Sequence, residues 1–72
     1  MEDYPVRLPI RLGQFLKLSA LAESGAHARE LITEGLVLVN GVVETRRTHQ
    51  LQAGDQVSLT LSGSPSYRVT EQ

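Results

Sequence analysis

The 72-residue sequence contains no cysteine and no tryptophan, and only three aromatic residues, Tyr4, Phe15 and Tyr67. Without cysteine there are no disulfide bonds and no thiolate zinc sites, which suits the reducing cytoplasm where we expect this protein to reside. No apolar run is long enough to span a membrane, and the acidic start Met1-Glu2-Asp3 lacks the basic residues of a targeting signal. Three aromatics are too few for a sheet that stacks single-stranded bases.

The residue patterns that catalyse reactions are also missing. The chain has no Ser-His-Asp arrangement, no glycine-rich phosphate loop and no cluster of metal ligands, and its two histidines, His27 and His49, are far apart. We therefore expect no enzymatic activity, no bound metal and no cofactor. A chain of this length buries one modest core, which favours a single domain over residues 1–72.

The charge is unevenly distributed along the chain. The formal net charge is −1, but residues 7–50 contain six basic and four acidic residues, a difference of +2. The ends carry the other four acidic residues and one arginine. The middle of the chain is therefore mildly basic, which is the part where a nucleic-acid surface would be expected.

The first third of the chain predicts an extended segment followed by a helix. Residues 4–10 alternate in part between apolar and polar side chains, and Pro5 and Pro9 exclude a central strand, so residues 1–10 are predicted to form an N-terminal arm or edge strand. From Leu12 the apolar residues recur at helical spacing, which predicts a short helix whose apolar face continues to Leu18 or Leu21.

A second helix is predicted over residues 25–34. Ser24 provides a side-chain acceptor for the free amides at its start, and Gly35 suits the left-handed conformation that often ends a helix. Its expected buried stripe consists of Ala28, Leu31 and Ile32.

The remainder of the chain predicts strands. Asn40-Gly41 lies between β-branched runs and favours a type I′ hairpin, because both central residues of that turn need positive φ. After the turn at residues 53–56, alternation predicts a strand with one apolar face, formed by Val57, Leu59 and Leu61. Residues 62–72 are predicted to be a C-terminal tail with a short edge strand at 67–69. The expected fold is α+β: two short helices packed on a small, mostly antiparallel sheet, with its core in residues 11–61.

This order of elements resembles the S-four domain, also called the alpha-L RNA-binding domain, and in particular its small stand-alone bacterial members. The resemblance covers roughly fifty residues and is carried by Arg11-Leu12, Phe15-Leu16, Ser24, Ala28, Leu31-Ile32, Gly35, Val37, Val39-Asn40-Gly41, Gly54-Asp55 and Val57. The sequence departs from the family at three positions. Gly25 stands where many members carry Arg, Gly13 where Asp is frequent, and Leu38 where a polar or basic residue is common.

The resemblance implies an RNA-binding protein that recognises structured RNA, ribosomal RNA or tRNA-like, by shape and through phosphate contacts. The candidate RNA-binding residues are Arg11, Lys17, Ser24, Gly25, His27, Arg29, Asn40, Arg46, Arg47 and His49. A ribosomal particle or another protein is a further expected partner, and a monomer is the expected state. The alternative is a protein-interaction module that keeps the fold and has lost most RNA affinity, which the net charge, Gly25 and the apolar Leu36 and Leu38 favour.

Several candidates also have a purely structural interpretation. A lone helical lysine such as Lys17 usually serves solubility. Asn40 is explained by its turn, and Ser24 by helix capping. On a strand, Arg46 and Arg47 would point to opposite faces, so we expect one of them to contact RNA while the other covers an edge or pairs with Glu44.

Overall fold

The computed structural model describes residues 1–72 and contains two helices and seven strands. In chain order they are β1 (Glu2–Val6), β2 (Ile10–Arg11), α1 (Leu12–Leu18), α2 (Gly25–Thr33), β3 (Val37–Val39), β4 (Val42–Val43), β5 (Gln50–Leu51), β6 (Gln56–Leu59) and β7 (Tyr67–Glu71). Neither helix combines the length and apolar composition needed to cross a membrane.

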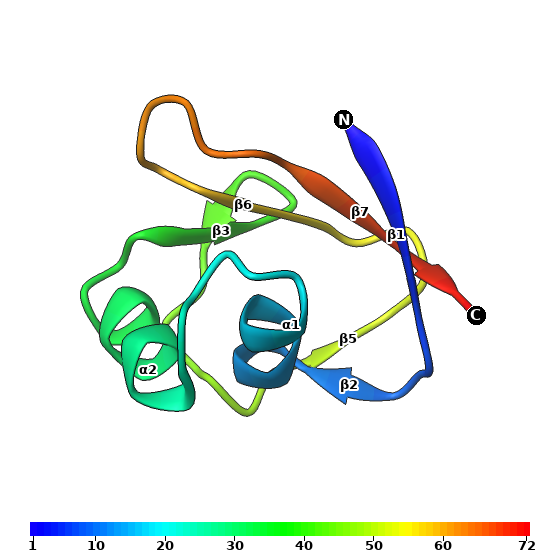
Figure 1. Ribbon diagram of the computed structural model, residues 1–72, viewed down its shortest axis with the longest axis horizontal. Coiled ribbons are helices and arrows are strands. Elements are labelled where there is room, and N and C mark those ends of the chain that lie inside the picture. Colours follow the sequence, from blue (N-terminus) through cyan, green and yellow to red (C-terminus); the bar gives the residue numbers. More distant parts are fainter.

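Five of the strands form one sheet in the order β1-β7-β6-β3-β4. The β1–β7 pair is parallel and the other pairs are antiparallel. β2 and β5 form a separate antiparallel ribbon. Figure 1 shows α1 and α2 on the same side of β3 and β6, with the β2–β5 ribbon beside α1. The expected α+β fold, with two short helices on a mostly antiparallel sheet, is confirmed.

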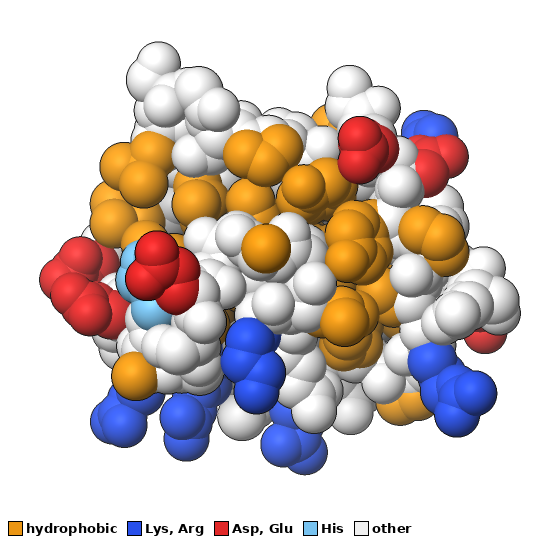
Figure 2. All heavy atoms as spheres, in the orientation of Figure 1, with side chains coloured by type: hydrophobic (Ala, Val, Ile, Leu, Met, Phe, Trp, Pro, Cys, Tyr) orange, Lys and Arg blue, Asp and Glu red, His pale blue; other side chains and the backbone are white.

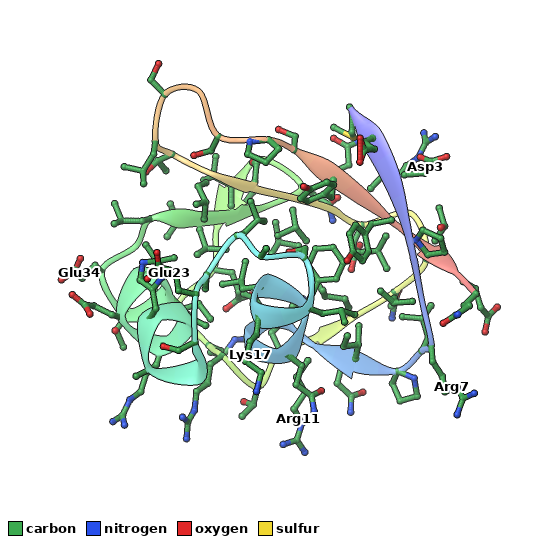
Figure 3. All side chains as sticks on the ribbon, in the orientation of Figure 1. Asp3, Arg7, Arg11, Lys17, Glu23 and Glu34 are labelled. Carbon is green, nitrogen blue, oxygen red and sulfur yellow. The ribbon has the colours of Figure 1, made fainter.

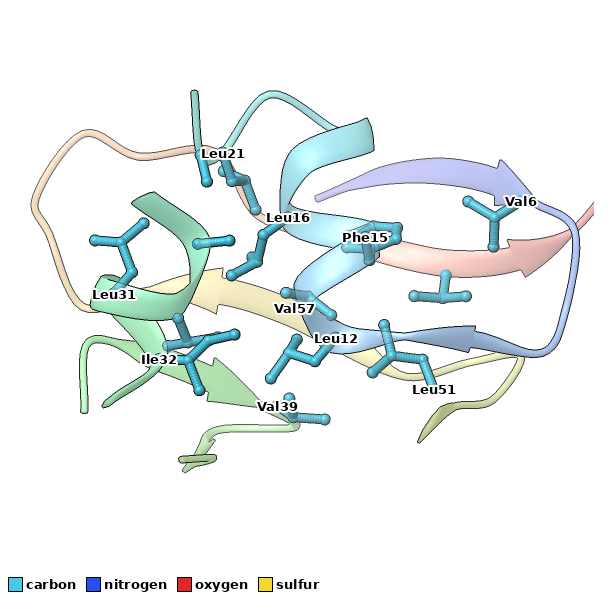
Figure 4. Packing of buried hydrophobic residues seen from close by; sticks show 14 residues of the cluster. Val6, Leu12, Phe15, Leu16, Leu21, Leu31, Ile32, Val39, Leu51 and Val57 are labelled. Carbon is cyan, nitrogen blue, oxygen red and sulfur yellow. The ribbon is translucent and has the colours of Figure 1, made fainter. Parts of the chain in front are cut away.

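The hydrophobic core lies between the two helices and the sheet (Figure 4). Phe15 is fully buried at its centre and contacts Tyr4 and Tyr67 edge to face, with ring centroids 5.5 and 6.4 Å apart. Edge-to-face aromatic pairs stabilise a folded protein by more than the burial of their surface area alone. Val6 and Val69 are also buried, so the two end strands add to the core made by the middle of the chain.

The local structure around α2 and the hairpin follows the residue pattern. Ser24 caps α2, its Oγ accepting a hydrogen bond from the amide of His27 at 3.1 Å. Gly35 has φ +75° directly after the helix, and Asn40 and Gly41 have φ 55° and 80° at the hairpin. The predicted cap, helix end and positive-φ turn are therefore confirmed.

Two predictions about the last third of the chain are wrong. β7 is not an edge strand, because β1 pairs with it on one side and β6 on the other. The edge on this side of the sheet is β1, where Pro5 is tolerated because an edge strand has amides that need no partner in the sheet. Leu61 does not continue the apolar face of Val57 and Leu59, since β6 ends at Leu59 and Leu61 is 49% exposed.

Candidate nucleic-acid interface

The start of α1 is fastened to the segment between β4 and β5. The amide of Leu12 donates to the carbonyl oxygen of His49 at 2.8 Å, and the amide of Gly13 donates to that of Arg47 at 3.0 Å. The first free amides of the helix are thereby satisfied by backbone rather than by a side-chain cap. Arg11, which directly precedes α1, and Arg47 are consequently held next to each other.

A shallow, open hollow of about 220 Å³ forms where α1, α2 and this segment meet. We call it the arginine hollow; it is lined by Arg11, Gly13, Gln14, Gly25, Arg29, Arg47 and Thr48. No hydrophobic and no acidic side chain lines it. None of its three arginines forms an ion pair with a carboxylate. The hollow therefore concentrates uncompensated positive charge on a protein whose net charge is negative.

The surface view shows the same separation of charge. Basic side chains project along one margin of the molecule in Figure 2, where Arg11 and Lys17 are found in the labelled view of Figure 3. Glu23, Glu34 and Asp3 lie away from that margin in the same view (Figure 3). The basic surface is thus local, although the whole chain is slightly acidic.

The first turn of α2 adds to the positive potential. Gly25 is its first residue and lines the hollow. The Ser24 cap takes the amide of His27, which leaves the amides of Gly25 and Ala26 free for solvent or a ligand. A helix start of this kind favours anions through its free amides and its dipole.

The side chain of His27 stabilises the backbone at the start of α2. Its Nδ1 accepts a hydrogen bond from the amide of Glu23 at 2.9 Å, so the ring is engaged with the chain just before α2. The side chain is half-buried and is not among those that line the hollow. The Ser24 side chain therefore bonds the backbone of His27, and the His27 side chain bonds the backbone of Glu23, so that both bonds stabilise the start of α2.

Arg46 and Arg47 differ in their surroundings although they are adjacent. Nε and an Nη of Arg46 donate to the two carboxylate oxygens of Glu44 at 3.0 and 3.2 Å. This bond lowers the pKa of Glu44 from 4.5 to about 2, because the guanidinium of Arg46 favours the charged carboxylate. Nδ1 of His49 lies 3.5 Å from the same carboxylate. Pairing with Glu44 was one of the two roles expected for the arginine that does not contact RNA, and Arg46 has that role, whereas Arg47 lines the hollow.

Two further candidates lie outside the hollow. The side chain of Asn40 donates to Asp55 Oδ1 at 3.0 Å and accepts from the amide of Gln56 at 2.9 Å, which ties the hairpin to β6. Lys17 lines a second groove on the other side of Gln14. The structure thus brings together Arg11, Gly25, Arg29 and Arg47 of the ten candidates.

Gly13, Gln14 and Thr48 also line the hollow and were not among the residues predicted from the sequence to bind RNA. Gln14 Oε1 accepts a hydrogen bond from the amide of Arg11 at 3.0 Å, one helical turn away. That i, i+3 spacing at a helix start was visible in the sequence as a possible capping interaction. The position of Thr48 depends on the contact of the 46–49 segment with α1 and had no local signal.

Comparison with known families agrees with this architecture. The family model described as the S4 domain matches residues 7–70. The chain belongs to the S4 domain family. The family match therefore spans most of β2 to β7, with both helices and the arginine hollow.

Individual relatives are found by sequence and by structure. YbcJ of Escherichia coli is 47% identical over 49 residues, covering 68% of this chain and 70% of its own. The probable ribosome maturation protein RlbA of Bacillus subtilis is 44% identical over 55 residues, covering 76% and 78%. The solution structure of E. coli YbcJ, which is described as having an alpha-L motif involved in RNA binding, aligns with a TM-score of 0.64 and 36% identity, covering 96% of this chain and 84% of YbcJ.

A third similarity concerns the fold alone. The trimeric structure of heat shock protein 15 from Vibrio cholerae aligns with a TM-score of 0.75, at 18% identity. It covers 89% of this chain, and this chain spans 65% of that one.

Proposed function

We propose that this protein binds structured RNA and that the arginine hollow holds phosphates of the RNA backbone. The observation that carries the proposal is the convergence of Arg11, Arg29 and Arg47, all without carboxylate partners, beside the free amides of α2. The planar guanidinium fork bonds two phosphate oxygens at once, which makes arginine suited to this contact.

The same surface supports recognition by shape rather than by sequence. The hollow has no aromatic side chain on which an unpaired base could stack. Phosphate contacts position a protein on a nucleic acid and carry no base information directly. A folded RNA, whose backbone presents several phosphates at fixed distances, fits a cluster of three arginines better than a flexible single strand does.

The names of the relatives suggest which kind of RNA this chain binds. The family and the YbcJ relative point to binding rather than catalysis, and the name of RlbA associates it with ribosome maturation. On this basis we propose ribosomal RNA, or an RNA of tRNA-like fold, as the ligand. A ribosomal particle in the cytoplasm would be the setting, with this chain acting as a monomeric, non-enzymatic partner.

Fluorescence anisotropy with a labelled ribosomal RNA hairpin, and with an unstructured strand of equal length, tests the proposal. Binding should prefer the hairpin. With about three phosphates neutralised, log K should fall with log salt at a slope of about −2 to −3. Replacing Arg11, Arg29 and Arg47 together by Ala should abolish measurable binding. A control that replaces Arg7, Arg46 and Arg68 removes the same charge from outside the hollow and should weaken binding far less.

The outcomes separate the proposal from its rival, a protein-interaction module that has kept the fold without RNA affinity. Equal losses in the two triple variants would show that net charge, and not the hollow, governs binding. Binding that is absent at low salt, or insensitive to salt, would favour the rival. Circular dichroism of each variant establishes that the fold is retained.

A further inference from the structure

A second concave surface lies beside α1, across Gln14 from the arginine hollow. It has a volume of about 730 Å³, and we call it the α1 groove; its lining residues are Arg7, Leu8, Pro9, Ile10, Gln14, Lys17 and Leu18. Its volume falls within the range of ordinary ligand sites, but it is open along its length. The proposed RNA contacts leave this surface unused.

The floor of the α1 groove is aliphatic. Leu18, the last residue of α1, is 55% exposed and is one of the large hydrophobic residues on the surface of the protein. Leu8 and Ile10 pack against the core with one side and remain partly exposed on the other. Figure 2 shows hydrophobic atoms exposed between α1 and β1, in the region of this groove.

The groove is held in shape by the chain around it. Tyr4 Oη donates a hydrogen bond to the carbonyl oxygen of Leu18 at 3.0 Å, which joins the end of α1 to β1. The Tyr4 ring also packs against Phe15 in the core, with centroids 5.5 Å apart. The exposed Leu18 side chain is thus presented by a fixed backbone, as a preformed site requires.

Two unpaired cations stand at the rim. Arg7 and Lys17 are exposed, and neither forms an ion pair with any carboxylate of the chain. Figure 3 shows them on different elements, Lys17 on α1 and Arg7 after β1. An aliphatic floor with a positive rim matches the anatomy of a protein interface, whose core is apolar and whose rim is polar and exposed to solvent.

We propose that the α1 groove docks an acidic, amphipathic segment of a partner protein. Apolar side chains of the segment would cover Leu18, Leu8 and Ile10, while its carboxylates would meet Arg7 and Lys17. Charge complementarity favours an acidic partner. A basic or neutral segment would leave Arg7 and Lys17 without opposite charges next to the apolar contact. The proposal goes beyond RNA binding and does not depend on it.

An RNA occupant fits the groove less well. The floor offers leucine, isoleucine and proline, but no aromatic ring for base stacking. Gln14 is the one amide side chain in the lining, and its Oε1 is already used by the amide of Arg11. RNA phosphates would find the two cations but would cover an aliphatic surface with polar backbone, which gains little from burial.

The test uses the full chain labelled with ¹⁵N and a synthetic peptide that carries leucines at helical i, i+3, i+4 spacing and glutamates between them. Two analogues replace the glutamates by glutamine or by lysine. The glutamate peptide should shift the amide resonances of Leu8, Ile10 and Leu18, the glutamine analogue should bind more weakly, and the lysine analogue should not bind.

A matched pair of variants locates the site. Leu18→Ser should weaken peptide binding about tenfold, because it removes a leucine side chain from the contact. Leu61→Ser removes a leucine of similar exposure, 49% against 55%, from outside the groove and should leave peptide binding unchanged. RNA affinity should be the same for both variants, which separates this surface from the arginine hollow.

Each contrary result removes the proposal. Shifts confined to residues outside the groove, such as Val42 and Val43 of β4, would assign the peptide to another surface. Equal binding of the glutamate and lysine peptides would show that the rim charges play no part. If an RNA hairpin shifted the groove resonances and the glutamate peptide did not, the groove would belong to the RNA surface.

Discussion

The backbone amide of Gly13 donates a hydrogen bond to the backbone carbonyl oxygen of Arg47 at 3.0 Å. This contact joins the start of α1 to a segment that has no regular secondary structure of its own. A Cβ added to Gly13 would lie 3.5 Å from the same oxygen, which is an ordinary van der Waals contact. The two backbones therefore lie close together but still leave room for a Cβ at position 13. The position of Arg47 in the hollow therefore depends on the start of a helix more than thirty residues earlier.

The first prediction separates the two adjacent arginines. Arg47→Ala should weaken binding to a ribosomal RNA hairpin and reduce the salt slope by about 0.7 to 0.9, as expected for one lost phosphate contact. Arg46→Ala removes the same charge, but its guanidinium already bonds Glu44, so it should change the slope little. Anisotropy titrations over a series of salt concentrations measure both.

The comparison contradicts the proposed site if Arg46→Ala has the larger effect. That result would mean that the Glu44 pair opens when RNA binds and that Arg46 is the contacting residue. Unfolding curves in urea show whether either variant has altered the stability of the fold.

The sequence predicted the elements that depend on local rules. Ser24 before α2, Gly35 after it and the Asn40-Gly41 turn each have a conformational requirement that only a few residue types satisfy, and all three were placed correctly. The buried stripe of α2 follows from the 3.6-residue period in the same way. The fold class then followed from the order of these elements.

The features that the sequence did not predict depend on contacts between distant segments. β7 lies inside the sheet because β1, at the other end of the chain, pairs with it in parallel, and strand alternation carries no information about such a neighbour. The different roles of Arg46 and Arg47 likewise depend on how Glu44 is oriented after β4. The hydrogen bonds of the Asn40 side chain to Asp55 and to the amide of Gln56 also join segments that are fifteen or more residues apart in the sequence.

The second prediction is a gain of affinity. Gly25 lines the hollow, and a Cβ added there would meet no atom within 4 Å. Gly25→Arg should therefore fit without strain and place a fourth guanidinium beside the other three. We expect RNA affinity to rise and the salt slope to steepen by about 0.7 to 0.9.

Gly25→Ala is the control for this substitution, because it changes the backbone freedom of the helix start without adding charge. It should leave RNA affinity near that of the parent protein. An arginine at position 25 that left affinity unchanged would indicate that RNA does not approach the start of α2.

The third prediction concerns Asn40. Asn40→Ala removes its hydrogen bonds to Asp55 and Gln56 and places alanine at a φ of 55°, so unfolding free energy should fall by about 2 kcal/mol. Asn40→Gly restores the conformational freedom but not the bonds and should lose less. RNA affinity at a temperature where both variants are folded should be unchanged, and a clear loss there would assign Asn40 to the RNA surface.

The fourth prediction is a pH dependence of stability that originates at Glu44. Its pKa is about 2 in the folded protein and near 4.5 without the bond from Arg46, so the unfolded chain binds a proton more readily. The contribution of Glu44 to stability should therefore be fully present above about pH 4.5 and should be lost as the pH falls toward 2.

Urea unfolding at pH 7 and pH 3 measures this contribution. Glu44→Gln cannot titrate and should lose less stability between the two pH values than the parent protein does. Glu34→Gln removes an exposed carboxylate that has no ion-pair partner, so it should lose as much as the parent. If Glu44→Gln and Glu34→Gln behaved alike, the Glu44–Arg46 bond would not persist in solution. Arg46 would then be as free as Arg47 to contact RNA, and the difference expected between the two arginine variants would disappear with it.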